Sequence, residues 1–145
     1  MKTLQQVLND KKHKEIISIA PHRPVFDALV ILAEYKIGAL AVMQNEQLVG
    51  IFSERDYARE VVLQGRSSKS TAIAEVMTAK VITGKPSDLV EASLKLMSEK
   101  RFRHLPVLDG DKMIGMLSLG DLVKEIIADQ QNMIAMLEGY IRGKK

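Results

Sequence analysis

An internal repeat constrains this chain more than any other feature of its sequence. Within the 145 residues, residues 16–62 align without a gap to residues 81–127, at an offset of 65. Eleven of these 47 pairs are identical. Composition alone would give about three identical pairs, because common residues occur at roughly 7% each. The shared residues, numbered in the first copy, are Ile17, Pro21, Val25, Leu29, Glu34, Leu40, Val42, Gly50, Ser53, Asp56 and Glu60. The chain is therefore predicted to contain two copies of one folding unit.

Each copy has the hydrophobic pattern of a β-α-β-β-α unit. In the first copy we expect strands at 16–19, 39–43 and 48–52 and helices around 25–32 and 56–63. In the second copy we expect strands at 81–83, 105–108 and 113–117, a turn at 109–111, and helices over 89–100 and from 120 onward. A unit this small buries too little apolar surface to be stable alone. We therefore predict an α/β (α+β) fold in which two repeats, 1–66 and 67–131, pack about a pseudo-two-fold axis.

Two further segments flank the repeats. Leu4, Val7 and Leu8 predict a short N-terminal helix. Residues 132–145 are predicted to form a C-terminal amphipathic helical extension with an apolar stripe at helical spacing. The stripe consists of Met133, Met136, Leu137, Tyr140 and Ile141. Two interpretations stay open for it, namely packing against its own domain and contact with a partner helix or a second protomer.

Composition and charge argue against several classes of function. The absence of cysteine excludes disulfides, cysteine-based metal sites and a thiol nucleophile, and it fits a cytoplasmic protein. A net charge of +3 and only six aromatic residues argue against nucleic-acid binding. The longest apolar runs are far shorter than the ~18–20 residues of a membrane span. The N-terminus has no apolar signal-peptide core, so we expect neither export nor a membrane anchor.

Residues that could support catalysis are not arranged for it. The three histidines, His13, His22 and His104, lack metal-ligand spacing. No serine or lysine lies at a spacing that would place a base beside a nucleophile, and neither a P-loop nor a Gly-x-Gly-x-x-Gly motif is present. We therefore expect no enzymatic activity, no metal and no catalytic cofactor. The basic run Lys12-His13-Lys14 is predicted to be an exposed loop.

The most distinctive motif occurs once in each repeat, where a strand ends in Ser-x-x-Asp and a helix begins. It spans Gly50–Asp56 in the first copy and Gly115–Asp121 in the second. One interpretation is a helix-capping box, which stabilises a helix start by ~1 kcal/mol. The other is a ligand site, because backbone N–H groups at such a junction attract an anion and a carboxylate can hold a ribose diol. The glycine of the motif either admits a ligand or only permits the strand geometry.

With these two junctions and a Leu105-Pro106-Val107 strand, the gapless repeat resembles a tandem pair of CBS domains, named after cystathionine β-synthase and called a Bateman module. The resemblance covers about residues 5–130. It implies two clefts between the repeats that bind adenosine-containing ligands. AMP is the expected ligand, with ADP, ATP, NAD and S-adenosylmethionine as alternatives. It also implies a homodimer.

The resemblance implies crossed sites, in which the ribose-binding Asp comes from one repeat and most of the adenine pocket from the other. The first cleft would comprise Asp56, Ile82, Phe102, Arg103 and His104. The second cleft would comprise Asp121, Ile17, Ile37, Gly38 and Ala39. Ser53 and Ser118 would assist near the phosphate, and Arg55 is a further candidate there.

The two implied clefts differ in charge. Arg103 and His104 of the second repeat occupy the positions that Gly38 and Ala39 occupy in the first. In the family that the chain resembles, basic residues at these positions often bind phosphate, and an arginine fork suits a phosphate group. We therefore expect the Asp56 cleft to bind a mononucleotide more tightly. The alternative is that the basic pair is a solvated edge that precedes a strand.

Two classes of function remain. The first is a non-catalytic sensor, in which a bound adenine nucleotide changes the conformation and a separate effector protein responds to the change. Such a switch requires different affinities for two conformations. The second is a protein-interaction or dimerisation module with vestigial clefts, whose working surface is the C-terminal stripe.

Overall fold

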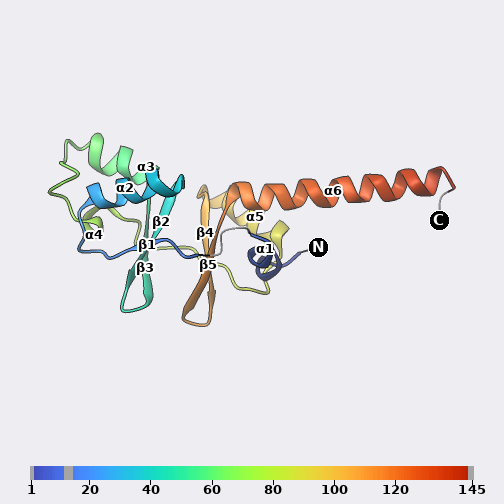
Figure 1. Ribbon diagram of the computed structural model, residues 1–145, viewed down its shortest axis with the longest axis horizontal. Coiled ribbons are helices and arrows are strands. Elements are labelled where there is room, and N and C mark those ends of the chain that lie inside the picture. Colours follow the sequence, from blue (N-terminus) through green and yellow to red (C-terminus); the bar gives the residue numbers. More distant parts are fainter. Residues whose placement is uncertain (1, 12–14, 144–145) are drawn as a thin grey trace. The chain divides into compact units, whose positions relative to one another are not determined.

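The computed structural model describes residues 2–11 and 15–143 of the chain (Figure 1). The predicted loop at 12–14 lies outside the described residues. The chain divides into two compact units. We call residues 15–83 and 108–114 the first-repeat unit, and residues 1–14, 84–107 and 115–145 the second-repeat unit.

The first-repeat unit contains a three-stranded sheet in the order β1-β2-β3. Its strands are β1 (Ser18–Ile19), β2 (Ala39–Gln44) and β3 (Gln47–Ser53). Its helices are α2 (Val25–Tyr35), α3 (Glu54–Asp56), the π-helix η1 (Tyr57–Val62) and α4 (Ile73–Val76). Strand β1 is parallel to β2, and β2 is antiparallel to β3. The predicted elements of the first copy are present, but β1 is shorter than expected. The helix predicted around 56–63 is mostly the π-helix η1.

The core of this unit is built on β2. Four successive residues from Ala39 to Val42 are buried, as expected for a strand that is covered on both faces. Phe52 of β3 and Val25 of α2 are fully buried in the same cluster. Asn45 and Glu46 join β2 to β3 with positive φ angles of 52° and 65°. Positive φ at both central residues is the geometry of a tight hairpin turn, so β2 and β3 form a hairpin.

The second-repeat unit is more helical. Its helices are α1 (Leu4–Asp10), α5 (Val90–Lys100) and α6 (Leu119–Ile141), and it contains most of β4 (His104–Asp109) and β5 (Lys112–Ser118), without their residues in 108–114. Strands β4 and β5 form the predicted hairpin, with Gly110 at φ +64° in its turn. The strand predicted at 81–83 is wrong, because these three residues pair with no strand, and the next residue, Gly84, makes only an isolated bridge, with Val107. The proline two residues after this bridge lacks an N–H group with which to continue a ladder.

The duplication extends to the backbone geometry of the helix ends. The residue that follows α2 and caps it is Lys36, with φ 55°, and the residue that caps α5 is Arg101, with φ 58°. The two residues are related by the offset of 65. In both places a residue in the left-handed backbone conformation turns the chain towards the next strand. Neither residue is a glycine, and residues other than glycine rarely adopt this conformation. The repeat is therefore structural as well as sequential.

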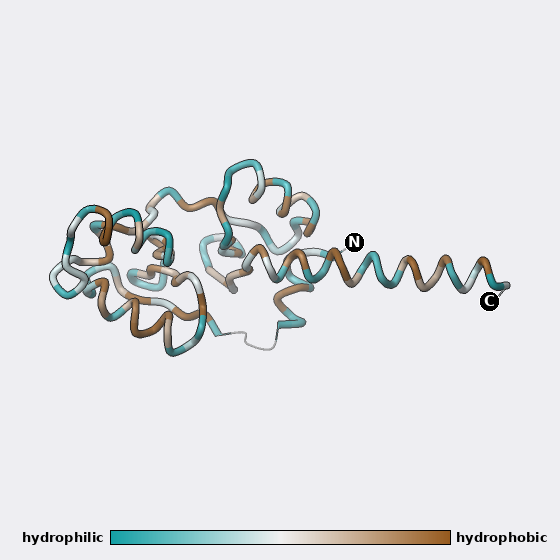
Figure 2. Tube along the Cα trace, turned by 90° about the horizontal axis from the view of Figure 1, so that it is seen from above, coloured by the Kyte–Doolittle hydropathy of each residue, from teal (hydrophilic) through white to brown (hydrophobic). Residues whose placement is uncertain are grey.

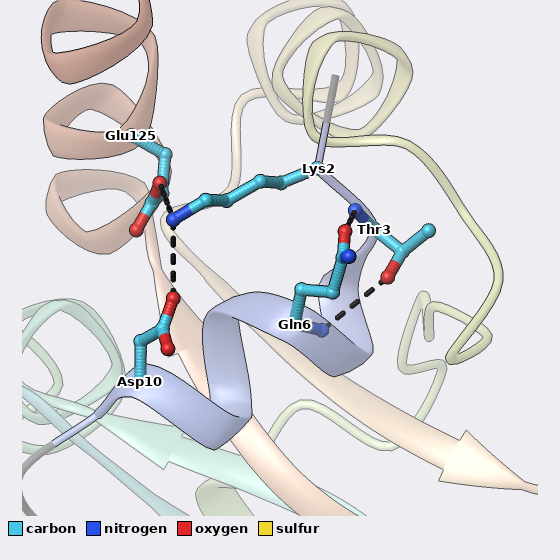
Figure 3. A network of polar contacts seen from close by, with 5 residues as sticks. All are labelled: Lys2, Thr3, Gln6, Asp10 and Glu125. Carbon is cyan, nitrogen blue, oxygen red and sulfur yellow. Dashed lines mark hydrogen bonds and ion pairs between the residues drawn. The ribbon is translucent and has the colours of Figure 1, made fainter.

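Helix α1 is attached to the second-repeat unit by polar contacts (Figure 3). The Lys2 ammonium lies 3.0 Å from a carboxylate oxygen of Glu125 in α6 and 3.1 Å from one of Asp10. Hydrogen bonding to Glu125 and then to Asp10 raises the pKa of Lys2 above its ordinary value. Thr3 and Gln6 form a reciprocal capping box at the start of α1. The predicted N-terminal helix is thus confirmed, and Leu4, Val7 and Leu8 are its buried residues.

Helix α6 is continuous for 23 residues. Residues 132–141 of the extension expected over 132–145 therefore continue the helix that begins beside Ser118 and are not a separate element. In Figure 2, apolar and polar turns alternate along its outer part. The five residues of the predicted stripe are 55–83% exposed. Packing of the stripe against its own domain is therefore wrong for the chain as described.

Candidate functional site

The junction after β3 is a capping box whose carboxylate is also held from outside. The Asp56 N–H donates to Ser53 Oγ at 3.2 Å, and the Ser53 N–H donates to Asp56 Oδ2 at 2.9 Å. The Ser53 hydroxyl donates to the same Oδ2 at 3.1 Å. Thr78 Oγ1 donates to the other carboxylate oxygen, Oδ1, at 3.1 Å. The capping interpretation is confirmed, and Asp56 accepts hydrogen bonds on both oxygens.

The junction after β5 has the same cap with a different outside partner. The Asp121 N–H donates to Ser118 Oγ at 3.1 Å, and the Ser118 N–H donates to Asp121 Oδ2 at 2.8 Å. The Lys11 ammonium lies 3.0 Å from the same Oδ2. A neutral hydroxyl thus faces the first carboxylate, whereas a cation faces the second.

The Lys11 contact affects the ionisation of Asp121. Partial burial acts to raise the pKa of this carboxyl, but hydrogen bonds from the Ser118 N–H and the Lys11 ammonium outweigh it. The net effect holds the pKa of Asp121 below its ordinary value. A polar ligand of this carboxylate would have to displace Lys11 or share the carboxylate with it.

Each junction is bordered by the segment that leads into the other repeat. Thr78 precedes the second repeat, yet it exchanges two backbone hydrogen bonds with Ile51 of β3, at 2.8 and 2.9 Å. Lys11 precedes the first repeat, yet its ammonium donates to the carbonyl of Met116 in β5 at 3.0 Å. Ile51 and Met116 are equivalent positions of the repeat. The chain therefore crosses over between the repeats at both junctions.

We call residues 8–11 and 77–78 the lead-in segments, and the glycines of the motif leave space for them. A Cβ atom on Gly50 would lie 2.6 Å from Met77 Sδ and 2.9 Å from the Thr78 carbonyl oxygen. A Cβ atom on Gly115 would lie 2.5 Å from Leu8 Cδ2. Real Cβ atoms do not approach other atoms so closely. At Gly50 the near atoms include the Thr78 backbone, so the close approach of the chain to itself requires a glycine there. At Gly115 the near atoms belong to the end of the Leu8 side chain, which would have to shift to admit a Cβ atom.

The basic pair lies beside the second junction within the second-repeat unit. The Leu119 N–H donates to the Arg103 carbonyl at 2.8 Å. In the first-repeat unit the Glu54 N–H donates to the Gly38 carbonyl at 3.1 Å, which is the equivalent contact at an offset of 65. Arg103 is exposed, and Phe102 and His104 are half-buried. The positions that differ most in charge between the repeats therefore border the two caps.

The structure brings together only part of each predicted cleft. Asp56, Ser53, Arg55 and Ile82 share the first-repeat unit with Ile17, Ile37, Gly38 and Ala39. Asp121 and Ser118 share the second-repeat unit with Phe102, Arg103 and His104. The first predicted cleft combines Asp56 with the basic pair of the other unit, and the second combines Asp121 with Gly38 of the other unit. Both combinations stay predictions.

The predicted apolar lining differs in exposure. Ile17 and Ile37 pack against the core of the first-repeat unit, and Ala39 is 5% exposed. Ile82, by contrast, is 36% exposed. Ile82 therefore has the most accessible side chain of the four.

Sequence reasoning missed Thr78 and Lys11. Both contact the site from segments outside the aligned repeats, 22 and 110 residues away from the carboxylates that they meet. The available signal was the pair of motif glycines, because a glycine inside a strand indicates close approach of another segment.

Residues 2–11 and 15–143 contain no cluster of three histidine, cysteine, aspartate or glutamate residues that could hold a metal ion. No helix among the described residues is long and apolar enough to cross a membrane.

The Lys11–Asp121 contact predicts a pH-dependent contribution to stability. The folded-state pKa of Asp121 lies below its unfolded value, so the carboxylate contributes stability above the unfolded value, near 3.9, and loses it as pH falls through the folded value. Lys11→Met is expected to lower the free energy of unfolding at neutral pH by up to about 1 kcal/mol. Urea unfolding between pH 7 and pH 2.5 measures the difference. It should shrink towards the acid end, where only the hydrogen bond from Lys11 to the Met116 carbonyl is left, and a difference that stayed constant with pH would contradict this ion pair.

Two segments of the chain match known CBS domains. The CBS domain profile matches residues 11–63 and 73–128. The mitochondrial CBS domain-containing protein CBSX3 of Arabidopsis thaliana is 40% identical over 124 residues, which cover 82% of this chain and 60% of that protein. The chain thus spans less than two thirds of the length of that relative.

Solved structures of proteins with CBS domains also resemble this chain. A protein with CBS domains from Burkholderia ambifaria is 50% identical, with a TM-score of 0.85 over 89% of this chain and 96% of that one. A CBS domain pair solved with 5′-methylthioadenosine and S-adenosylmethionine has a TM-score of 0.78 at 23% identity, over 89% of this chain and 98% of that one. At that identity the second match shows a shared fold.

Proposed function

This chain belongs to the CBS domain family, and on that premise we propose that it is a non-catalytic regulatory module that binds an adenosine-containing ligand without consuming it. The observation that carries the proposal is the duplicated junction, in which a half-buried carboxylate is fixed at a helix start. A fixed carboxylate suits a ribose diol, because it accepts two hydrogen bonds at little ordering cost. The adjacent backbone N–H groups suit a phosphate.

AMP is the ligand that we propose first. Arg103 and Arg55 supply positive charge for a phosphate, and His104 lies next to Arg103 in the sequence as a further polar group. A related fold was solved with two adenosine-containing molecules, 5′-methylthioadenosine and S-adenosylmethionine, which supports the adenosyl class. ADP, ATP, NAD and S-adenosylmethionine are the other members of this class to be tested.

The proposed clefts keep the crossed composition. Asp56 and Ser53 hold the ribose and phosphate of a ligand whose adenine lies near Ile82, with the basic pair of the second repeat at the phosphate. In the second cleft Asp121 and Ser118 act with Ile17, Ile37, Gly38 and Ala39. Support comes from Thr78, since this residue, four positions before Ile82, is hydrogen-bonded to Asp56.

The bound ligand is proposed to act by changing the conformation of the protein. Ligand binding shifts the population of two conformations of a homodimer, and a separate effector protein responds. The proposed location is the cytoplasm, although the Arabidopsis relative is named as mitochondrial. The second candidate function is an interaction module with vestigial clefts, and the exposed stripe of α6 favours it.

A thermal-shift screen tests the ligand class. A ligand that binds only the native state raises the midpoint of unfolding, by about 5–10 °C at about 100 times its Kd for a domain of this size. We expect this shift with AMP at millimolar concentration and none with guanosine monophosphate as the matched control. No shift with AMP, ADP, ATP, NAD or S-adenosylmethionine would favour the interaction module.

A further inference from the structure

The outer part of α6 carries an apolar face that the second-repeat unit leaves exposed. Leu122 is the one buried residue of this helix. The exposed apolar side chains beyond it include Ile127, Met133, Ile134, Met136, Leu137, Tyr140 and Ile141, at 48–83% exposure. Single apolar residues scattered over a surface are normal, but this many exposed apolar side chains along one helix are typical of an interaction site.

These side chains follow a seven-residue period. Residues at alternating spacings of four and three form a single seam, which consists of Val123, Ile127, Gln130, Ile134, Leu137 and Ile141. In heptad notation Ile127, Ile134 and Ile141 are the a positions, and Val123, Gln130 and Leu137 are the d positions. We call these six residues the α6 seam. A strict 3.5-residue period is the pattern of a helix that pairs with another helix.

The two flanks of the α6 seam differ in chemistry. The e positions are Lys124, Gln131 and Glu138, and the g positions are Ile126, Met133 and Tyr140. One flank is therefore polar, with a cation near one end and an anion near the other, and the opposite flank is apolar. This asymmetry determines which orientation of a second helix the face fits.

A second copy of α6 fits this pattern when it runs antiparallel. With Ile134 opposite Gln130 of the second copy, Ile127 faces Leu137 and Ile141 faces Val123, so every a position meets a d position. The e positions then face one another, and Lys124 lies beside Glu138 of the second copy, twice by symmetry. The g positions meet on the other side, where Met133 flanks its own equivalent and Ile126 flanks Tyr140.

A parallel pair fits less well. In a parallel coiled coil each e position faces a g position of the other helix. Glu138 would then lie beside Met133 of the second copy, and Lys124 beside Leu119. Both charges would border apolar side chains, and neither would meet its opposite. The charge distribution along α6 therefore favours the antiparallel pair.

We infer that α6 pairs with α6 of a second copy of this chain as an antiparallel two-helix coiled coil through the α6 seam. Residues 123–141 give an overlap of about 27 Å at 1.5 Å per residue. The inference specifies a surface, an orientation and a register for the proposed homodimer, and it stands independently of nucleotide binding.

The seam is tested by two matched glutamate substitutions. Leu137→Glu places a charge in the seam, whereas Met136→Glu places the same charge on the neighbouring residue, which is 75% exposed and lies outside the seam. In sedimentation equilibrium the wild type is expected to dimerise. Leu137→Glu should raise the dimer dissociation constant at least about tenfold, and Met136→Glu should leave it unchanged. A monomeric wild type, or equal effects of the two variants, would overturn the inference.

The orientation is tested by disulfide trapping, which has no background because the chain has no cysteine. Ile127→Cys and Leu137→Cys are prepared separately and oxidised alone and as a mixture. The antiparallel register predicts a disulfide between the two variants in the mixture and little in either alone. Efficient crosslinking of each variant alone would overturn the antiparallel orientation. The AMP thermal shift of Leu137→Glu is expected to match the wild type, so a failure of nucleotide binding would be seen separately from a failure of pairing.

Discussion

Replacing Gly50 by alanine is expected to destabilise the protein by about 1–3 kcal/mol, the cost of forcing a methyl group into a packed interior. The new Cβ would lie 2.9 Å from the Thr78 carbonyl oxygen. That carbonyl accepts a hydrogen bond from Ile51 at 2.9 Å, so it cannot move away without breaking the contact between the lead-in segment and β3. Equilibrium urea denaturation measures the change in free energy of unfolding.

Gly139→Ala is the matched control for this substitution. Gly139 lies inside α6, where an added Cβ would meet no atom within 4 Å and the backbone has no positive φ. Alanine there should stabilise the helix by roughly 0.5–1 kcal/mol. Equal and small effects of the two substitutions would show that the lead-in segment does not approach β3 as described.

Replacing Asp56 by asparagine is expected to weaken AMP binding by about 10–150-fold, because hydrogen bonds to a charged group contribute about 1.5–3 kcal/mol. Asparagine retains a side-chain oxygen that can accept from the Ser53 N–H, so the cap should largely persist. Isothermal titration calorimetry with AMP measures the loss, and the unfolding midpoint without ligand verifies the fold.

Asp121→Asn should have a smaller effect on AMP binding. The Asp121 carboxylate is already paired with Lys11 at 3.0 Å, whereas Asp56 faces a neutral hydroxyl. The basic pair proposed for the Asp56 cleft adds to this difference. Equal losses from the two substitutions would contradict unequal clefts. Lys11→Met should then strengthen binding at the second cleft, since it removes the competing cation.

The sequence was sufficient to predict the fold class, the repeat and most of the elements. The apolar runs of β2 and β3, the hairpin at Gly110 and the capping residues Ser53 and Ser118 are all local signals, and each is observed. The strand expected at 81–83 failed because a short apolar run does not determine whether its backbone finds a partner. The π-helix at 57–62 has no local signal in the sequence that we can identify.

The sequence predicted the two carboxylates of the site but not the side chains that contact them. Repeat alignment compares equivalent positions, so it identifies Asp56 with Asp121 but says nothing about what meets them. Thr78 and Lys11 reach these carboxylates only because the chain crosses over between repeats. Their different chemistry makes the two junctions unequal in a way that the basic pair alone did not indicate.

The most direct test of the central claim is equilibrium dialysis of the wild-type protein against AMP and, separately, ATP, followed by chromatography of the retained nucleotide. We predict saturable retention of AMP and recovery of both nucleotides unchanged. Absence of retention would contradict the proposed adenosyl site, and recovery of ADP or adenosine would contradict a module that binds its ligand without consuming it.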